Sequence, residues 1–100
     1  MSRFRLSPEA ARDIEDILEY IAQDSVPAAR RVRQALLAAC RRLAEHPGMG
    51  HRREDLTDKP VRFFPVYSFL IIYDPATTPL EIVRVLRGAQ DIPAILEREE

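Results

Sequence analysis

The arginines are the side chains of this chain best suited to hold an anionic partner. Every basic residue except Lys59 is an arginine, and the formal net charge is −1. A guanidinium group stays charged and can hold a carboxylate or a phosphate through two parallel hydrogen bonds. Because the chain as a whole is not basic, nonspecific nucleic-acid binding is not expected, and an anionic partner must meet a local patch. A GC-rich genome would give the same enrichment in arginine without any functional cause.

Five arginines are placed to form such a patch. They occupy the loop before the predicted sheet and the strands themselves: Arg52, Arg53, Arg62, Arg84 and Arg87. Arg84 stands between two valines, and a charge inside an apolar strand is costly unless that face is open or the charge is paired. The sequence leaves both possibilities open: a contact with a ligand or partner, or a buried ion pair. The candidate carboxylates for such a pair are Glu81, Asp74 and Asp91.

The sequence contains no pattern typical of a metal site or a nucleophile. His46 and His51 are five residues apart without a matching cysteine or carboxylate, so no zinc or iron site is predicted. Cys40 falls on the apolar face of a helix, where a buried thiol is expected, and a single cysteine excludes an intrachain disulfide. The carboxylates of residues 13–19 are expected on an outward, solvated helix face. We therefore predict neither a cofactor nor a bound metal.

Two long amphipathic helices precede these strands. Ser7 followed by Pro8 predicts a helix start, since the hydroxyl can cap the helix and proline suits the first position. Apolar residues then recur at helical spacing, and a second cap-and-proline start follows after a short break. The predicted helices are 8–24 and 26–46, joined as an antiparallel hairpin. Its seam is expected to consist of Ile14, Ile17, Leu18, Val32, Leu36 and Leu43.

The remaining segments predict strands and a short terminal helix. A strand is expected at 3–7, and three more at 61–65, 66–74 and 80–88, with a break at Pro75–Pro79. The run Phe69-Leu70-Ile71-Ile72 does not alternate, so its strand should be central and buried on both faces. A helix within 89–97, capped by Asp91, would follow the last strand.

These elements predict an α+β fold: an N-terminal strand, an α-helical hairpin packed on one face of a mainly antiparallel sheet, and a short C-terminal helix. One hundred residues suffice for a single domain, 1–100. No stretch is long and apolar enough to span a membrane, and the N-terminus lacks the apolar core of a secretion signal. With its single cysteine, the chain is expected to be cytoplasmic.

Three segments in this order resemble the ParE/RelE toxin superfamily: LSPEAARDIEDILEYIA, PGMGHRREDL, and LIIYD followed by IVRVLRGAQD. The resemblance extends from Phe4 to about Leu96. It implies a RelE/ParE-like fold and the toxin role in a type II toxin–antitoxin system. The resemblance implies one of two activities: RelE-like members cleave messenger RNA on the ribosome, whereas ParE-like members inhibit DNA gyrase by binding it.

The end of the last strand departs from the RelE pattern. RelE-like nucleases carry an arginine soon after the strand's glycine and a tyrosine or histidine a few residues later. Here Gly88 is followed by Ala89 and Gln90, and Leu96 stands where the acid or base would fall. No tyrosine or histidine occurs after Tyr73. RNA cleavage requires a base, an acid and cations, so the missing side chains favour the ParE branch and a non-enzymatic protein.

We therefore expect a ParE-like toxin that inhibits DNA gyrase and forms a hetero-oligomer with a ParD-like antitoxin, without membrane or sequence-specific nucleic-acid binding of its own. The alternatives are a RelE-like ribosome-dependent endonuclease and a non-toxic member of the fold that still binds an antitoxin. The residues predicted to contact the antitoxin or the target are Arg52, Arg53, Arg62, Arg84, Arg87, Ile92 and Leu96.

Overall fold

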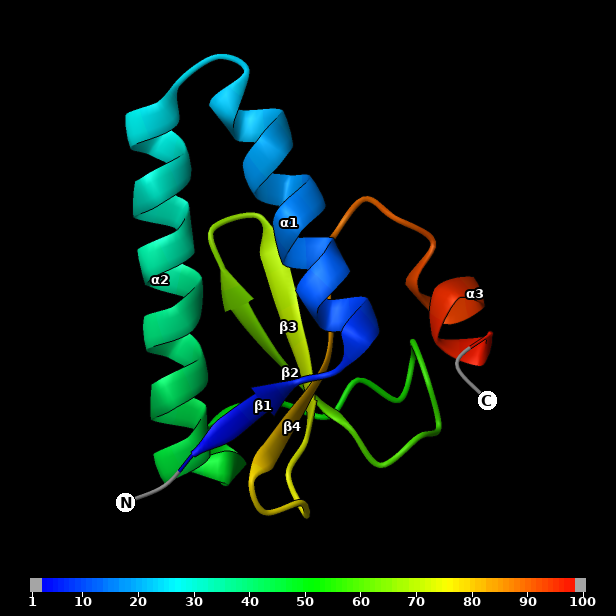
Figure 1. Cartoon of the computed structure of the whole chain (residues 1–100). Helices are drawn as coiled ribbons and strands as arrows, with labels where there is room; N and C mark the ends of the chain where they lie inside the picture. Colours follow the sequence, from blue (N-terminus) through cyan, green and yellow to red (C-terminus); the bar gives the residue numbers. More distant parts are fainter. Residues whose placement is uncertain (1–2, 99–100) are drawn as a thin grey trace.

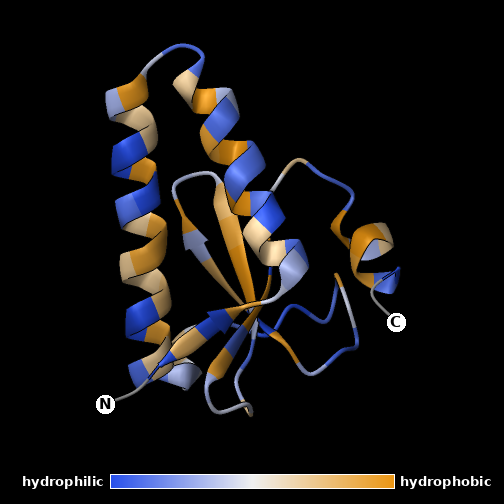
Figure 2. Ribbon diagram, viewed as in Figure 1, coloured by the Kyte–Doolittle hydropathy of each residue, from blue (hydrophilic) through white to orange (hydrophobic). Residues whose placement is uncertain are grey.

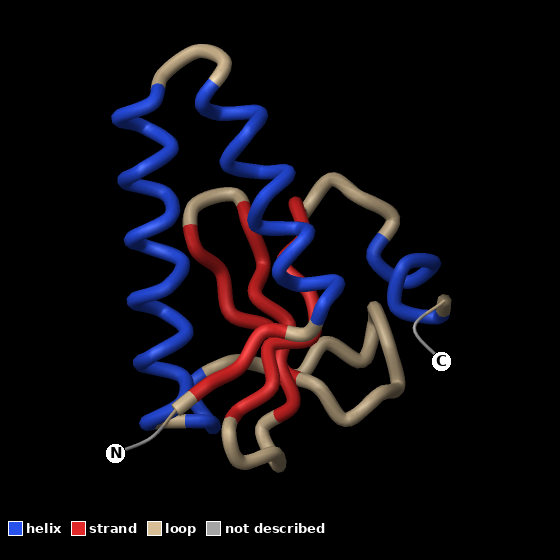
Figure 3. Tube along the Cα trace, viewed as in Figure 1, coloured by secondary structure: helices blue, strands red, loops and turns tan. Residues whose placement is uncertain are grey.

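Figure 1 shows the computed structural model of the chain, which describes residues 3–98. The elements are β1 (Phe4–Leu6), α1 (Pro8–Ala22), α2 (Val26–Glu45), a 3-10 helix η1 (Pro47–Met49), β2 (Arg62–Val66), β3 (Phe69–Asp74), β4 (Leu80–Arg87) and α3 (Ile92–Glu97). The helical hairpin of α1 and α2 lies on one face of the sheet, and α3 lies apart from it on the other side (Figures 1 and 3). The predicted α+β architecture is confirmed.

The helices begin where their capping residues stand. The Ser7 side chain accepts a hydrogen bond from the backbone N–H of Ala10 at 3.0 Å, and Pro8 occupies the first helical position. Ser25 caps α2 in the same way, with Pro27 in its first turn. These caps satisfy backbone groups that a helix leaves without partners at its start. Both predicted helix starts are confirmed, and the helices end one or two residues earlier than expected.

The four strands of the described chain are ordered β1-β4-β3-β2. β1 runs parallel to β4, while β2–β3 and β3–β4 are antiparallel pairs. The sheet is therefore mainly antiparallel, as predicted, and β3 and β4 are its two inner strands. Since β1 pairs with β4 only as far as Ile82, the second half of β4 has no strand on its outer side among the described residues.

The boundary between β2 and β3 was predicted wrongly. Val66 pairs with Phe69, which leaves Tyr67 and Ser68 as a two-residue turn rather than part of a strand. Tyr67 has a positive φ of 54°. Two-residue hairpin turns require such a conformation, and Asn-Gly or Gly-containing pairs usually indicate it. The Tyr-Ser pair carries no such signal, so the sequence did not show the turn.

The sheet is apolar on both faces, and a different set of elements covers each. Under the hairpin, Ile14, Leu36 and Leu43 are buried, and Ile17, Leu18 and Val32 pack partly buried against the same cluster. Figure 2 shows this apolar side of the helices turned toward the sheet. On the opposite face, Ile92 and Leu96 of α3 pack with Val61, Phe63, Ile72 and Leu86. The predicted seam and the two-sided burial of β3 are both confirmed.

Cys40 lies in the core beneath the hairpin, as predicted. Its burial raises the pKa of the thiol from 9.0 to about 12, because a thiolate would lose its hydration there. None of the helices that the structure describes is long and apolar enough to cross a membrane. Across residues 3–98, no three side chains among histidines, cysteines and carboxylates come together in a way that could hold a metal ion.

Candidate functional site

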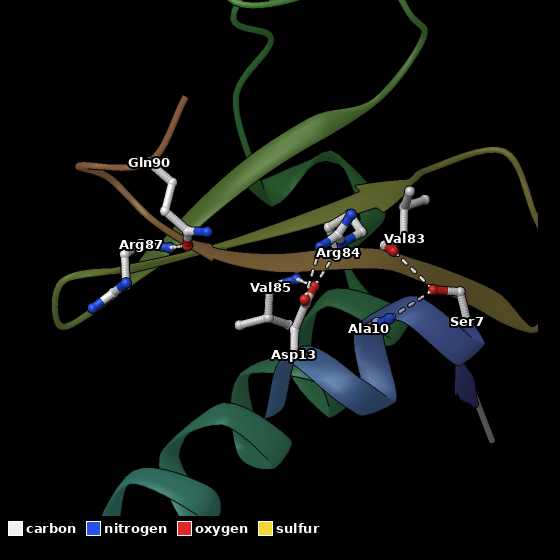
Figure 4. Close-up of polar contacts among 8 residues, drawn as sticks. All are labelled: Ser7, Ala10, Asp13, Val83, Arg84, Val85, Arg87 and Gln90. Carbon is white, nitrogen blue, oxygen red and sulfur yellow. Dashed lines mark hydrogen bonds and ion pairs between the residues drawn. The ribbon is translucent and has the colours of Figure 1, made fainter. Parts of the chain in front are cut away.

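Arg84 forms a partly buried ion pair with Asp13 of α1 (Figure 4). Its Nε donates to Asp13 Oδ2 at 2.7 Å and its Nη2 donates to Oδ1 at 2.8 Å. The side chains of Arg84 and Asp13 are only 16% and 13% exposed. The same carboxylate accepts the backbone N–H of Val85 at 3.0 Å. Asp13 therefore joins α1 to β4 through three hydrogen bonds.

This pair corrects two predictions. The sequence predicts Asp13 on the solvated face of its helix, and it offers Glu81, Asp74 and Asp91 as the candidate partners of Arg84. Those carboxylates bond to other groups: Glu81 pairs with Arg5, Asp74 accepts the N–H of Ala76 in a turn, and Asp91 caps α3. The physical reason is that α1 starts directly after β1 and crosses the unpaired edge of β4, which brings Asp13 beside Arg84.

Side chains also close the rest of that edge of β4. The Ser7 hydroxyl donates to the carbonyl of Val83 at 2.7 Å, and the backbone N–H of Ser7 donates to the carbonyl of Ile82 at 3.0 Å. Further along, Gln90 Oε1 accepts the backbone N–H of Arg87 at 2.7 Å (Figure 4). A free strand edge invites pairing with another chain. Here Ser7, Asp13 and Gln90 occupy backbone groups that such pairing would need.

A second set of contacts fixes the loop that enters the sheet. The Tyr73 hydroxyl donates to the carbonyl of Pro47 at 2.6 Å and accepts the N–H of Gly50 at 2.8 Å. Arg62 Nη1 donates to the carbonyl of Gly50 at 2.7 Å. Burial raises the pKa of Tyr73 above its ordinary value. A Cβ on Gly50 would lie 2.6 Å from the Tyr73 hydroxyl oxygen and 2.9 Å from the Phe63 carbonyl oxygen, so only glycine fits there.

This anchored loop carries Arg52 and Arg53 at the surface. Arg53 holds Asp55 through two hydrogen bonds, Nε to Oδ1 at 3.0 Å and Nη2 to Oδ2 at 2.9 Å. These bonds keep the pKa of the Asp55 carboxyl below its ordinary value. Arg52 is exposed and forms no ion pair within residues 3–98. The two neighbouring arginines therefore differ in their availability to a partner.

Arg87 lines a groove between α1 and the C-terminal end of β4, next to the turn that joins β2 and β3. The groove has a volume of about 510 Å³. Its apolar walls come from Ile17, Tyr20, Ile21, Phe69 and Val85, and its polar lining from Asp13, Asp16, Ser68, Arg87 and Gln90. The Arg87 side chain points away from the Arg84–Asp13 pair (Figure 4). Tyr20, on the α1 side, is 68% exposed, so this groove offers both apolar and charged contacts to a partner.

Ile92 and Leu96 hold α3 against the sheet. Both side chains are buried, and the Asp91 carboxylate accepts the N–H of Ala94 at the start of the helix. At its other end, the Lys59 ammonium donates to the carbonyl of Leu96. A partner could reach Ile92 and Leu96 only if α3 left the sheet.

The predicted contact residues thus fall into separate groups. Arg84 on β4 and Arg62 on β2 make intramolecular bonds, Arg53 pairs locally, and Arg52 and Arg87 remain exposed. Sequence reasoning missed the groove and the bonds of Asp13, because both depend on how α1 crosses the sheet. The capping position of Ser7 was visible in the sequence, but its second bond to β4 was not.

The fold of this chain, a helical hairpin on one face of a mixed sheet, is shared with a solved structure. Its structure is similar to one described as "Chromosomal ParDE TA system from P. aeruginosa", with a TM-score of 0.69 and 20% sequence identity. The similarity covers 87% of this chain and 96% of that one, and it shows a shared fold. No curated protein matches the sequence.

The family follows from the sequence match. Residues 4–92 match the family described as "ParE toxin of type II toxin-antitoxin system, parDE". The chain therefore belongs to the ParE toxin family. The predicted superfamily and branch are both confirmed.

Proposed function

We propose that this protein arrests growth by binding DNA gyrase and that a ParD-like antitoxin neutralises it in a hetero-oligomer in the cytoplasm. The observation that carries the proposal is the ParE family match across residues 4–92, from β1 to the start of α3. The toxin–antitoxin class follows from that family, while the target and the mode of neutralisation are the parts that need testing.

The side chains near the end of β4 support binding rather than catalysis. Gln90 accepts a backbone N–H, and Ala89 has no titratable group. Tyr73, the last tyrosine of the chain, is held by two backbone groups of the loop that starts at Pro47, and its pKa is raised. A general acid or base needs access to the reacting proton and a pKa near the working pH. Tyr73 meets neither requirement.

Among the predicted contact residues, Arg52 and Arg87 fit a partner-binding role best, because both are exposed and Arg87 lines the groove beside α1. Arg53, Arg62 and Arg84 act mainly in holding the structure, through the bonds described above. Ile92 and Leu96 act through α3, which they fix on the sheet. An aliphatic side chain beside a carboxylate is the kind of partner group that the groove and Arg87 would accept together.

The test is a gyrase supercoiling assay with the purified protein, run beside a ribosome-dependent cleavage assay on messenger RNA. We expect supercoiling to be inhibited and the message to stay intact. Adding the product of the adjacent gene should restore supercoiling. Cleaved message together with unaffected supercoiling would instead identify an endonuclease. Inhibition of neither process, with the adjacent gene's product still bound, would identify a non-toxic member of the family.

A further inference from the structure

The outer side of α2 carries a set of arginines that the site described above does not use. Five side chains form it, and we call it the α2 arginine face: Arg30, Arg31, Arg33, Arg41 and Arg42. All five are exposed. The only acidic residue of the helix is Glu45, at its C-terminal end. In Figure 1, α2 is the outermost element on its side of the molecule, and Figure 2 shows hydrophilic bands along it.

This charge arrangement disfavours the folded chain by itself. Arg30, Arg31 and Arg33 follow the first turn of α2, which holds no acidic residue that could offset their charge. Arg30 and Arg33 are also three positions apart, a spacing at which like charges on a helix repel. A cluster of this kind persists more readily when something outside the chain compensates its charge.

No compensation comes from the described part of the chain. Three arginines elsewhere in the chain pair with carboxylates, in the Arg5–Glu81, Arg53–Asp55 and Arg84–Asp13 pairs, whereas Arg52 and Arg87 pair with none of the described carboxylates. None of the five residues of the α2 arginine face forms an ion pair within residues 3–98. The neighbouring α1 carries four exposed carboxylates, yet none of them pairs with α2: Glu9, Glu15, Asp16 and Glu19.

The spacing of the arginines suggests the shape of what they would bind. Arg30 and Arg41 are separated by 41 − 30 = 11 positions, as are Arg31 and Arg42. Eleven residues make three helical turns, so each pair lies on one stripe with a separation of about 16 Å along the axis. Leu37, which is partly exposed, lies on the first stripe between them. A matching partner would present two groups of carboxylates with an apolar side chain between them.

We infer that the α2 arginine face receives an acidic segment of the antitoxin. The inference rests on the proposed function, which supplies an antitoxin as the partner. Arginine suits the role because its planar group can hold a carboxylate through two bonds, which a lysine cannot do. A protein segment fits better than duplex DNA, because the acidic side of α1 next to α2 would repel a long, wide polyanion. A short acidic segment can stay on α2 alone.

The experiment measures binding of the adjacent gene's product to the wild type and to two double variants. The test variant is Arg30→Gln with Arg41→Gln. The control is Arg3→Gln with Arg12→Gln, which removes two exposed arginines outside α2 and gives the same change in net charge, from −1 to −3. Dissociation constants are measured at low and high salt, and the melting temperature of each free variant is recorded. A random-sequence DNA duplex serves as a second probe.

We expect the test variant to bind the antitoxin roughly 10-fold or more weakly at low salt, with a smaller loss at high salt. The control should bind within about 2-fold of the wild type, which corresponds to a negligible free-energy change. The melting temperature of the test variant should not fall, because neither arginine has a partner inside the described chain. Equal affinities for the two variants would overturn the inference, as would a loss confined to the DNA probe. If the wild type does not bind the adjacent gene's product at all, the proposed function itself fails.

Discussion

Replacing Asp13 by asparagine tests the contact that fixes α1 to the sheet. The asparagine keeps the shape of the side chain but removes its charge and places an N–H₂ group against the Arg84 guanidinium. The Asp13 carboxylate accepts two bonds from Arg84 and one from the Val85 backbone, and the pair is 13–16% exposed. Breaking one side of a buried ion pair costs about 3–5 kcal/mol. Because this pair is not completely buried, we expect Asp13→Asn to lower the unfolding free energy by about 2–4 kcal/mol.

Thermal and urea denaturation followed by circular dichroism would measure this loss, which for a chain of this size corresponds to a melting temperature lower by about 10–25 °C. Asp16→Asn is the matched control, since Asp16 lies one turn later on α1 and is exposed. It should change stability by no more than about 0.5 kcal/mol. A double-mutant cycle of Asp13→Asn with Arg84→Gln should show a coupling of about 1–3 kcal/mol. Equal effects of Asp13→Asn and Asp16→Asn, or a coupling near zero, would refute the ion pair as a link between α1 and β4.

Three further predictions concern the loop at Gly50, the core residue Cys40 and the groove that Arg87 lines. Gly50→Ala should destabilise the protein by about 1–3 kcal/mol because its Cβ would collide with the Tyr73 hydroxyl, whereas Gly48→Ala, which meets no neighbour, should be near neutral in the same denaturation assay. The folded Cys40 thiol has a pKa raised from 9.0 to about 12, so it is protonated in both states below pH 9, and only the unfolded chain ionises between the two values. The free energy of unfolding should therefore fall by up to about 1.4 kcal/mol per pH unit between pH 9 and about 12, and Cys40→Ala should remove this pH dependence. A thiol reagent at neutral pH should react with Cys40 only after the protein unfolds. Arg87→Gln should keep the melting temperature within about 2 °C of the wild-type value, because the Arg87 side chain is exposed. It should weaken the binding of the antitoxin or of gyrase about 5-fold or more. Unchanged binding of both partners would exclude Arg87 from either interface.

The closed edge of β4 narrows the ways in which a partner can bind. Ser7, Asp13 and Gln90 already satisfy backbone groups there, so adding a strand at this edge would require those bonds to break. A partner that uses the groove and the helices instead keeps the sheet intact. The binding surfaces proposed here, around Arg87 and on α2, are both of that kind.

The sequence by itself determined the features that depend on near neighbours. Ser7 and Ser25 predicted the helix starts, because a capping residue acts within three positions of its own place. The unbroken apolar run of β3 indicated burial on both faces, and Asp91 marked the start of α3. The family resemblance was also carried by short segments in a fixed order. All of these signals lie within one or two helical turns of the residues that they describe.

Only the tertiary structure decided which distant groups meet. Arg84 is 71 positions from Asp13, and no pattern in the sequence distinguishes Asp13 from the exposed carboxylates of the same helix. The bonds of Tyr73 to Gly50 and Pro47 likewise depend on where folding places that loop against the sheet. Tertiary structure also decides whether each arginine is available to a binding partner, because that depends on whether folding places a carboxylate within its reach. Periodicity can show that Arg30 lies off the apolar seam, but only the packed chain shows that no described carboxylate reaches it.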